Sequence, residues 1–237
     1  MELLLGMLLL LPLPAAVVLW RQARERGERR SNWSHLDREH VDDCFRGYKV
    51  AQVIVGPNAA SFVGLMHVAY DADGTAQCRH TRCTPPGLGC DCGFYAFRHR
   101  DRALHLLSNV EEAHPERCYA LLTADLDGDV LEYEHGFRAE RQRILAVDLD
   151  NRCHRCRMDA RADSAATTFF THPTFRGECS LATSARGLTA LPMDHAPIKP
   201  LCAAHAPDSR GRAYQLTELC DLTGTEVSVL RPALIEP

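Results

Sequence analysis

The N-terminus carries a long apolar run without charge. Residues 3–20 contain no charged side chain and end in Trp20, an aromatic residue of the kind enriched at membrane interfaces. A helix of this length spans about 27 Å, close to the ~30 Å of a bilayer core. We therefore expect residues 1–20 to form a single transmembrane helix.

The charges that flank this run predict which side of the membrane holds the rest of the chain. One acidic residue, Glu2, precedes the run, and five arginines follow it: Arg21, Arg24, Arg26, Arg29 and Arg30. Because cytoplasmic flanks of membrane helices are rich in Arg and Lys, we expect a cytoplasmic body, joined to the membrane by a tether at residues 21–43. A cleaved signal peptide, the alternative, would carry its positive charge before the run.

Beyond the tether, runs of β-branched and aromatic residues predict short antiparallel strands. The candidate strands are residues 48–55, 63–70, 119–126, 130–134 and 138–147. The last of these also fits a short helix. Asp127-Gly128 is a strong signal for a hairpin turn between two of the strands. Residues 94–110, in contrast, have apolar positions at helical spacing.

The order of these elements predicts an α+β fold in two parts. Residues 148–152 form a short polar joint. We expect a small Cys-rich domain with an antiparallel sheet at residues 44–150. A zinc-binding domain that resembles a zinc ribbon or a treble clef is expected to follow at residues 151–237.

The charge balance gives no reason to expect a nucleic-acid partner. The formal net charge is −4, so no general attraction to phosphate is predicted. Only two of the 27 basic residues are lysines, Lys49 and Lys199. We attribute the excess of arginine to a GC-rich coding sequence, and we do not assign the scattered arginines to phosphate binding.

Two pairs of residues in the C-terminal part have the spacing of a zinc site. Cys153 and Cys156 form a C-x2-C pair, and Cys202 and His205 form a later C-x2-H pair. Zinc takes four such ligands in a tetrahedron. The first pair fits a turn, and the second fits the first turn of a helix that begins near Pro200. We expect one shared site; the alternatives are two unrelated thiol pairs, or a ligand replaced by His154, His172, Cys179 or His195.

A second group of cysteines lies in a loop rich in glycine and proline: Cys78, Cys83, Cys90 and Cys92. Such a loop buries little apolar surface, and a bound metal ion would supply cohesion. We expect zinc here too, because clustered cysteines in a reducing cytoplasm bind metal more often than they form disulfides. His80 is an alternative ligand. An iron–sulfur cluster and free thiols are the other interpretations, the former because the C-x4-C spacing matches part of the plant-type ferredoxin pattern.

Three segments of the body carry distinctive motifs: Cys83-Thr84-Pro85-Pro86, Cys90-Asp91-Cys92-Gly93-Phe94-Tyr95-Ala96 and Glu134-His135-Gly136-Phe137-Arg138-Ala139-Glu140. They resemble motifs of a group of uncharacterised bacterial proteins from GC-rich genomes, which have a Cys-x-Cys-Gly-Ile-Tyr-Ala segment. The resemblance covers residues 47–147 and implies a shared domain, with no implied activity or substrate. The group has histidine at the position of Cys83, and this exchange would preserve a zinc ligand.

The sequence favours a binding module over an enzyme. It contains no Walker loop, dinucleotide-binding glycine pattern, nucleophile elbow or H-E-x-x-H motif. A zinc ion with four protein ligands also leaves no open position for a substrate. We expect a membrane-tethered, zinc-stabilised cytoplasmic module that binds an unidentified protein or ligand. The alternative is a redox or metal-dependent enzyme that uses the Cys78–Cys92 cluster as an iron–sulfur centre or a reactive thiolate.

Overall fold

The computed structural model describes residues 38–65, 68–78, 83–114, 117–150, 152–158, 168–171, 196–206 and 211–230. The segment Arg38–Pro237 forms one compact unit. The transmembrane helix expected at residues 1–20 lies outside the described residues, as does the tether up to residue 37. Of the helices that are described, none is both long and apolar enough to cross a membrane.

The described elements are mostly antiparallel strands with few helices, which confirms the expected antiparallel sheet. In chain order they are β1 (Arg38–Val55), β2 (Ala60–Gly64), β3 (Ala69–Tyr70), β4 (Asp73–Thr75), β5 (Phe94–Phe97), α3 (Arg100–Ala113), β6 (Ala120–Tyr133), β7 (Gly136–Asp150), α4 (His154–Met158), β8 (Thr168–Thr171), β9 (Ala196–Leu201), β10 (Ala213–Tyr214), α5 (Leu216–Thr223) and β11 (Glu226–Leu230).

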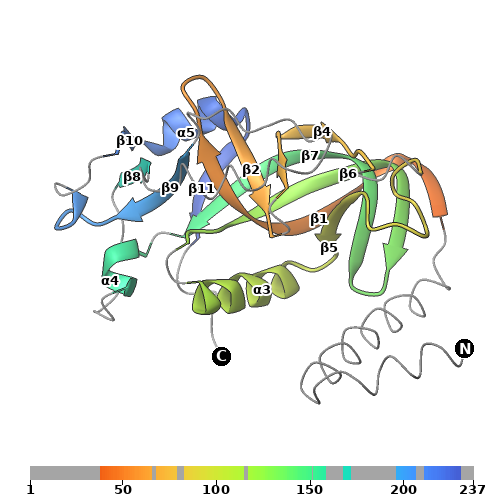
Figure 1. The fold of residues 1–237 in the computed structure, drawn as a ribbon, viewed down its shortest axis with the longest axis horizontal. Coiled ribbons are helices and arrows are strands. Elements are labelled where there is room, and N and C mark those ends of the chain that lie inside the picture. The colour runs from red at the N-terminus through yellow and green to blue at the C-terminus, as the bar shows by residue number, and fades with distance from the viewer. Residues whose placement is uncertain are drawn as a thin grey trace, which may run out of the picture. The chain divides into compact units, whose positions relative to one another are not determined.

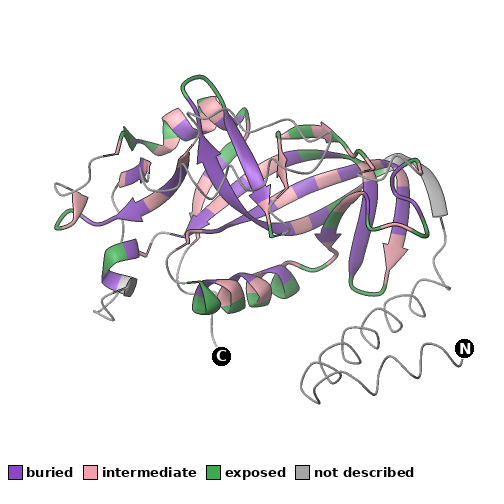
Figure 2. Ribbon diagram, viewed as in Figure 1, coloured by how far each residue is buried: buried purple, intermediate pink, exposed green. Residues whose placement is uncertain are grey.

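Three long strands form the centre of the sheet (Figure 1). β6 pairs antiparallel with β1 on one side and with β7 on the other. Along these strands buried positions alternate with more exposed ones (Figure 2), as expected for a sheet with different faces. One face buries a large apolar cluster that includes Val53, Phe62, Leu122 and Leu219.

Helix α3 covers part of the opposite face of the sheet. Its Ala103 and Leu107 pack with Val50 of β1 and with Tyr119 and Leu121 at the start of β6. The helix begins later than the sequence predicts, because the aromatic residues Phe94–Phe97 form β5 instead. β5 pairs with β7 over its whole length, so tertiary pairing outweighs the local helical spacing.

The hairpin turn predicted at Asp127-Gly128 is wrong. β6 continues through these residues to Tyr133, and the turn comes at residues 134–135, where Tyr133 pairs with Gly136. Gly128 has a φ of 76° and lies at a register shift in the ladder, so its left-handed backbone accommodates an irregularity in place of a turn. The N-terminal part of β1 pairs with this segment and extends the strand.

Strand pairing joins residues on both sides of the boundary expected at residue 150. β9 pairs with the end of β1, where Ile54 lies opposite Pro197. β11 pairs in parallel with Ala146–Asp150 of β7. The expected polar joint at residues 148–152 therefore includes the last residues of β7. Likewise, β1 begins at Arg38, within the range expected for the tether.

Candidate metal centres

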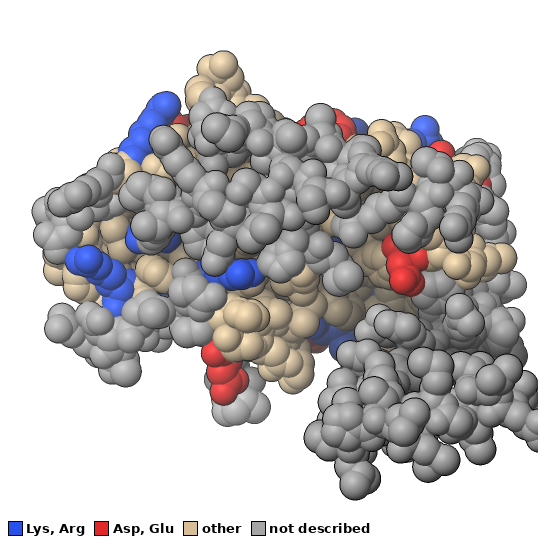
Figure 3. Space-filling view, viewed as in Figure 1, with Lys and Arg blue, Asp and Glu red and all other residues tan. Residues whose placement is uncertain are grey.

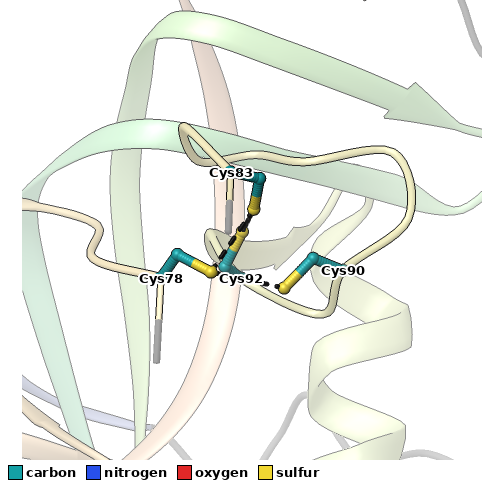
Figure 4. Close-up of side chains that lie close together, drawn as sticks. All are labelled: Cys78, Cys83, Cys90 and Cys92. Carbon is teal, nitrogen blue, oxygen red and sulfur yellow. Dashed lines mark hydrogen bonds between the residues drawn. The ribbon is translucent and has the colours of Figure 1, made fainter. Parts of the chain in front are cut away.

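The four cysteines of the first group converge beside β5, and we call them site 1: Cys78, Cys83, Cys90 and Cys92 (Figure 4). Cys78 follows β4, and the other three lie on the loop that leads into β5. All four sulfur atoms lie within 4.8 Å of one another. The Sγ–Sγ distances from Cys83 are 3.4 Å to Cys78 and 3.2 Å to Cys92, and Cys78 is 3.6 Å from Cys90.

Backbone groups of the loop also turn toward these sulfurs. The Gly87 N–H donates a hydrogen bond to Cys92 Sγ at 3.3 Å, and the Cys90 N–H donates to the Gly87 carbonyl at 3.1 Å. Gly93 has a φ of 118°, a conformation that side chains rarely adopt, and this lets the chain turn directly from Cys92 into β5. The local sequence thus supplies a tight turn and, from Gly87, an N–H donor to one of the thiols.

Arg138 of β7 connects this loop to the sheet. Its side chain is fully buried, with 0% exposure. The guanidinium group donates to the carbonyl oxygens of Cys90 and Gly87 and to the Tyr95 hydroxyl. A buried guanidinium that bonds two carbonyls of one loop holds that loop in a single conformation, because a broken bond would leave a buried polar group unsatisfied.

The thiols of site 1 form hydrogen bonds with one another, which bear on their pKa values. The pKa of Cys83 is raised well above its usual range, first by the hydrogen bond with Cys92 and then by burial. Burial is also the largest cause of the raised pKa of Cys90. Burial and the hydrogen bonds among these thiols thus favour the protonated form of Cys83 and of Cys90. A divalent cation would reverse this balance by binding the thiolates.

The second group also converges, and we call it site 2: Cys153, Cys156, Cys202 and His205. The first two lie at and within the short helix α4, and the last two on the turn after β9. His205 Nδ1 is 3.4 Å from Cys153 Sγ, 3.6 Å from Cys156 Sγ and 3.4 Å from Cys202 Sγ. The Cys156 and Cys202 sulfurs are 3.9 Å apart.

The second pair is not held on the helix that the sequence predicts. Pro200 lies within β9, and residues 202–206 form a turn in which the N–H groups of His205 and Ala206 donate to the Cys202 carbonyl. The pairing of β9 with β8, in which Pro200 lies opposite Phe169, keeps Pro200 extended, so it does not begin a helix. The turn still brings Cys202 and His205 to the same point.

Partly buried ion pairs fix the segment that precedes α4. Arg152 contacts Asp150 at 3.1 Å and Glu111 of α3, which is 6% exposed, at 2.5 Å. His154, the first residue of α4, is buried, and its Nδ1 lies 3.6 Å from Cys118 Sγ. These contacts tie site 2 to α3 and to the start of β6.

The surroundings of site 2 favour thiolate in a way that those of site 1 do not. The pKa of Cys153 is lowered to about 6. Burial acts to raise it, but hydrogen bonds from the backbone of Cys156 and Cys202 and from His205 outweigh burial. Donors that point at a sulfur stabilise its charged form, which is the form that binds a metal ion.

Both groups have the dimensions of a site for one ion. A Zn–S bond of about 2.3 Å places two sulfurs of a tetrahedron about 3.8 Å apart, and a sulfur and a nitrogen slightly closer. The observed separations of 3.2–3.9 Å lie around this value. An iron–sulfur cluster places several atoms between its cysteines, so sulfurs this close suit a single ion better.

The structure thus brings together all eight residues predicted as ligands, in two separate groups of four. Of the alternative ligands, His80, His172, Cys179 and His195 lie outside the described residues, and His154 contacts Cys118. None of the described cysteines forms a disulfide. The sequence does not predict the contacts of two arginines, the buried Arg138 and the partly buried Arg152. It places Arg138 only within a motif and Arg152 only at the end of a polar joint.

Comparisons with protein-family models, with curated proteins and with solved structures found no match to this chain. The candidate function therefore rests on the geometry of the two sites.

Proposed function

We propose that this chain is a membrane-tethered cytoplasmic module in which two structural zinc ions hold together a surface for an unidentified protein or ligand. The observation that carries the proposal is the convergence of two sets of four donors. Site 1 offers four thiols, and site 2 offers three thiols and one imidazole, each set with its donor atoms within 4.8 Å. Thiolate and imidazole in a tetrahedron are the donors and geometry that zinc prefers in structural sites.

The position of the sites supports a structural role. Site 1 joins the segment after β4 to the loop before β5, and site 2 joins α4 to the end of β9, so each ion would link segments that are separated in sequence. With four protein ligands, neither ion would keep an open position for a substrate. A zinc-ribbon or treble-clef-like arrangement of residues 151–237 is part of the proposal, supported by the C-x2-C pair at α4 and the turn after β9.

A redox or metal-dependent activity of site 1 is the second candidate. It is favoured by the exposure of this site, since Cys78, Cys83 and Cys90 are each partly exposed. In site 2, by contrast, all three cysteines are buried. Thiolates that reach solvent can react with oxidants, whereas buried thiolates do so slowly. The sulfur separations in site 1 suit a mononuclear iron as well as zinc.

Membrane attachment is proposed from the uncharged run at residues 3–20 and from the arginines that follow it. No nucleic-acid partner is proposed. On the face drawn in Figure 3, the acidic and basic side chains of the described residues are scattered, with no single patch of one sign. Among the described residues several charged side chains are paired, for example Arg46 with Asp125 at 2.8 Å and Arg141 with Asp127 at 2.7 Å.

Two measurements test the proposal. Metal analysis and an absorption spectrum of the full chain, purified without chelator, should give two zinc ions per chain and no visible colour. Iron with visible absorption would instead favour the redox candidate. Separately, the full chain should sediment with membranes and resist extraction at high pH, and deletion of residues 1–20 should release it. Release of the full chain at high pH would contradict the tether.

A further inference from the structure

Lys49 is a buried lysine, one of only two lysines in a chain whose other basic residues are arginines. Its side chain lies on β1, and the residue is 8% exposed. The amine lies 4.2 Å from the centre of the Tyr70 ring and 5.1 Å from that of Phe94, and it donates a hydrogen bond to Gln142 Oε1. The larger guanidinium of arginine, which is always charged, is not equivalent in so enclosed a place.

The polar groups around Lys49 offer more donors than acceptors. Gln142 is 3% exposed, and its Nε2 has no hydrogen-bond partner among the described residues. The same is true of the Tyr70 hydroxyl, which is buried at the atom level. Burial raises the pKa of Tyr70, so this hydroxyl keeps its proton and remains a donor. Buried donors without acceptors cost free energy, so an acceptor bound by these groups would stabilise the fold.

The charge of Lys49 indicates what kind of acceptor fits. Within the described part of the chain its ammonium group pairs with no carboxylate, and its contacts are the neutral Gln142 and two rings. Burial lowers its pKa to about 7, since the uncompensated charge is poorly solvated. A water molecule would satisfy one or two donors but would leave the charge uncompensated, whereas an anion would do both.

We propose that Lys49, Tyr70 and Gln142 form a binding site for a small monovalent anion of the size of chloride. The ammonium group would supply the charge, and the Tyr70 hydroxyl and the Gln142 amide would donate the remaining hydrogen bonds. The low exposure of Lys49 and Gln142 restricts the site to a small ion. None of these three residues belongs to site 1 or site 2.

The test is the chloride dependence of stability in the full chain. Unfolding by urea is followed while chloride replaces gluconate, a bulky anion, at constant ionic strength and neutral pH. Because an ion that binds only the folded state stabilises it by mass action, the unfolding equilibrium constant should fall tenfold for each tenfold rise in chloride above half-saturation. Lys49→Met should abolish this dependence, and Lys199→Met, which removes the other lysine, should retain it.

Chloride dependence that is absent from the wild type, or equal in wild type and Lys49→Met, would overturn the proposal. If Lys49→Met does not fold, Gln142→Leu provides a second variant, in which the chloride concentration for half-saturation should rise at least several-fold. Crystals of the wild type in bromide provide an independent measurement. An anomalous peak in contact with the Lys49 amine supports the site, and no peak at saturating bromide refutes it.

Discussion

Two glycines of the site 1 loop differ in the space around them, and this difference predicts a selective effect on metal binding. A Cβ added at Gly87 would lie 2.5 Å from Cys83 Sγ and 2.8 Å from Cys83 Cβ. A Cβ added at Gly89 would meet nothing within 4 Å. In Gly87→Ala the sulfur of a proposed ligand must move, whereas in Gly89→Ala nothing must move.

The expected size of the effect follows from the cost of overpacking, which is typically 1–3 kcal/mol. At about 2 kcal/mol, Gly87→Ala should weaken zinc binding at site 1 roughly thirtyfold. Gly89→Ala should change it less than about twofold, since an alanine methyl group in open space contacts no ligand. Site 2 should be unaffected in both variants.

The assay is competition for zinc between the full chain and a chromophoric chelator. Protection of individual cysteines from alkylation, read by mass spectrometry, assigns each binding step to a site. Wild-type affinity at site 1 in Gly87→Ala would contradict this prediction. So would an equal loss in the two variants, because that would mean that the loop tolerates no side chain for reasons unrelated to Cys83.

Three further predictions follow from burial and charge. Arg138→Met should weaken zinc binding at site 1 roughly 150-fold and leave site 2 unchanged, because about 3 kcal/mol of charge-assisted hydrogen bonds to the loop is lost; equal zinc affinity at site 1 in variant and wild type contradicts this. A hydroperoxide should remove metal from the half-exposed site 1 first, giving a one-zinc species with the cysteines of site 2 still protected; the reverse order of protection contradicts it. The pKa of Lys49 is about 7 in the folded chain and 10.5 in the unfolded chain, so between these values the unfolded chain binds one more proton. Between pH 7 and 10, in chloride-free buffer, the wild type should therefore gain about 1.4 kcal/mol of stability per pH unit relative to Lys49→Met. Parallel pH profiles would refute the last of these.

The candidate ligands could be predicted from the sequence because metal-binding chemistry leaves short spacings. C-x2-C, C-x2-H and C-x-C each place two donors on one turn, whatever the rest of the fold. Each pair supplies only two of the four ligands that zinc needs, so the sequence predicts that Cys156 and Cys202 belong to one site but not how the chain brings them together. The path that brings them together, through the pairing of β8 with β9, involves no local signal.

Local signals failed where a distant strand decides the conformation. Asp127-Gly128 is a good turn sequence, but pairing with β1 on one side and β7 on the other holds it within β6. Residues 94–97 have helical spacing, but pairing with β7 makes them a strand. The burial of Arg138 and Lys49 also could not be predicted from the sequence, because charged residues usually lie on the surface. Both are buried because other segments of the chain pack over them.

The most direct test of the account is the zinc content of the full chain and of two serine variants, one in each site. We expect two zinc ions in the wild type and one each in Cys92→Ser and Cys156→Ser, with the intact site of each variant still protected from alkylation. No zinc in the wild type, or wild-type zinc content in either variant, would contradict the assignment of the two groups as separate metal centres.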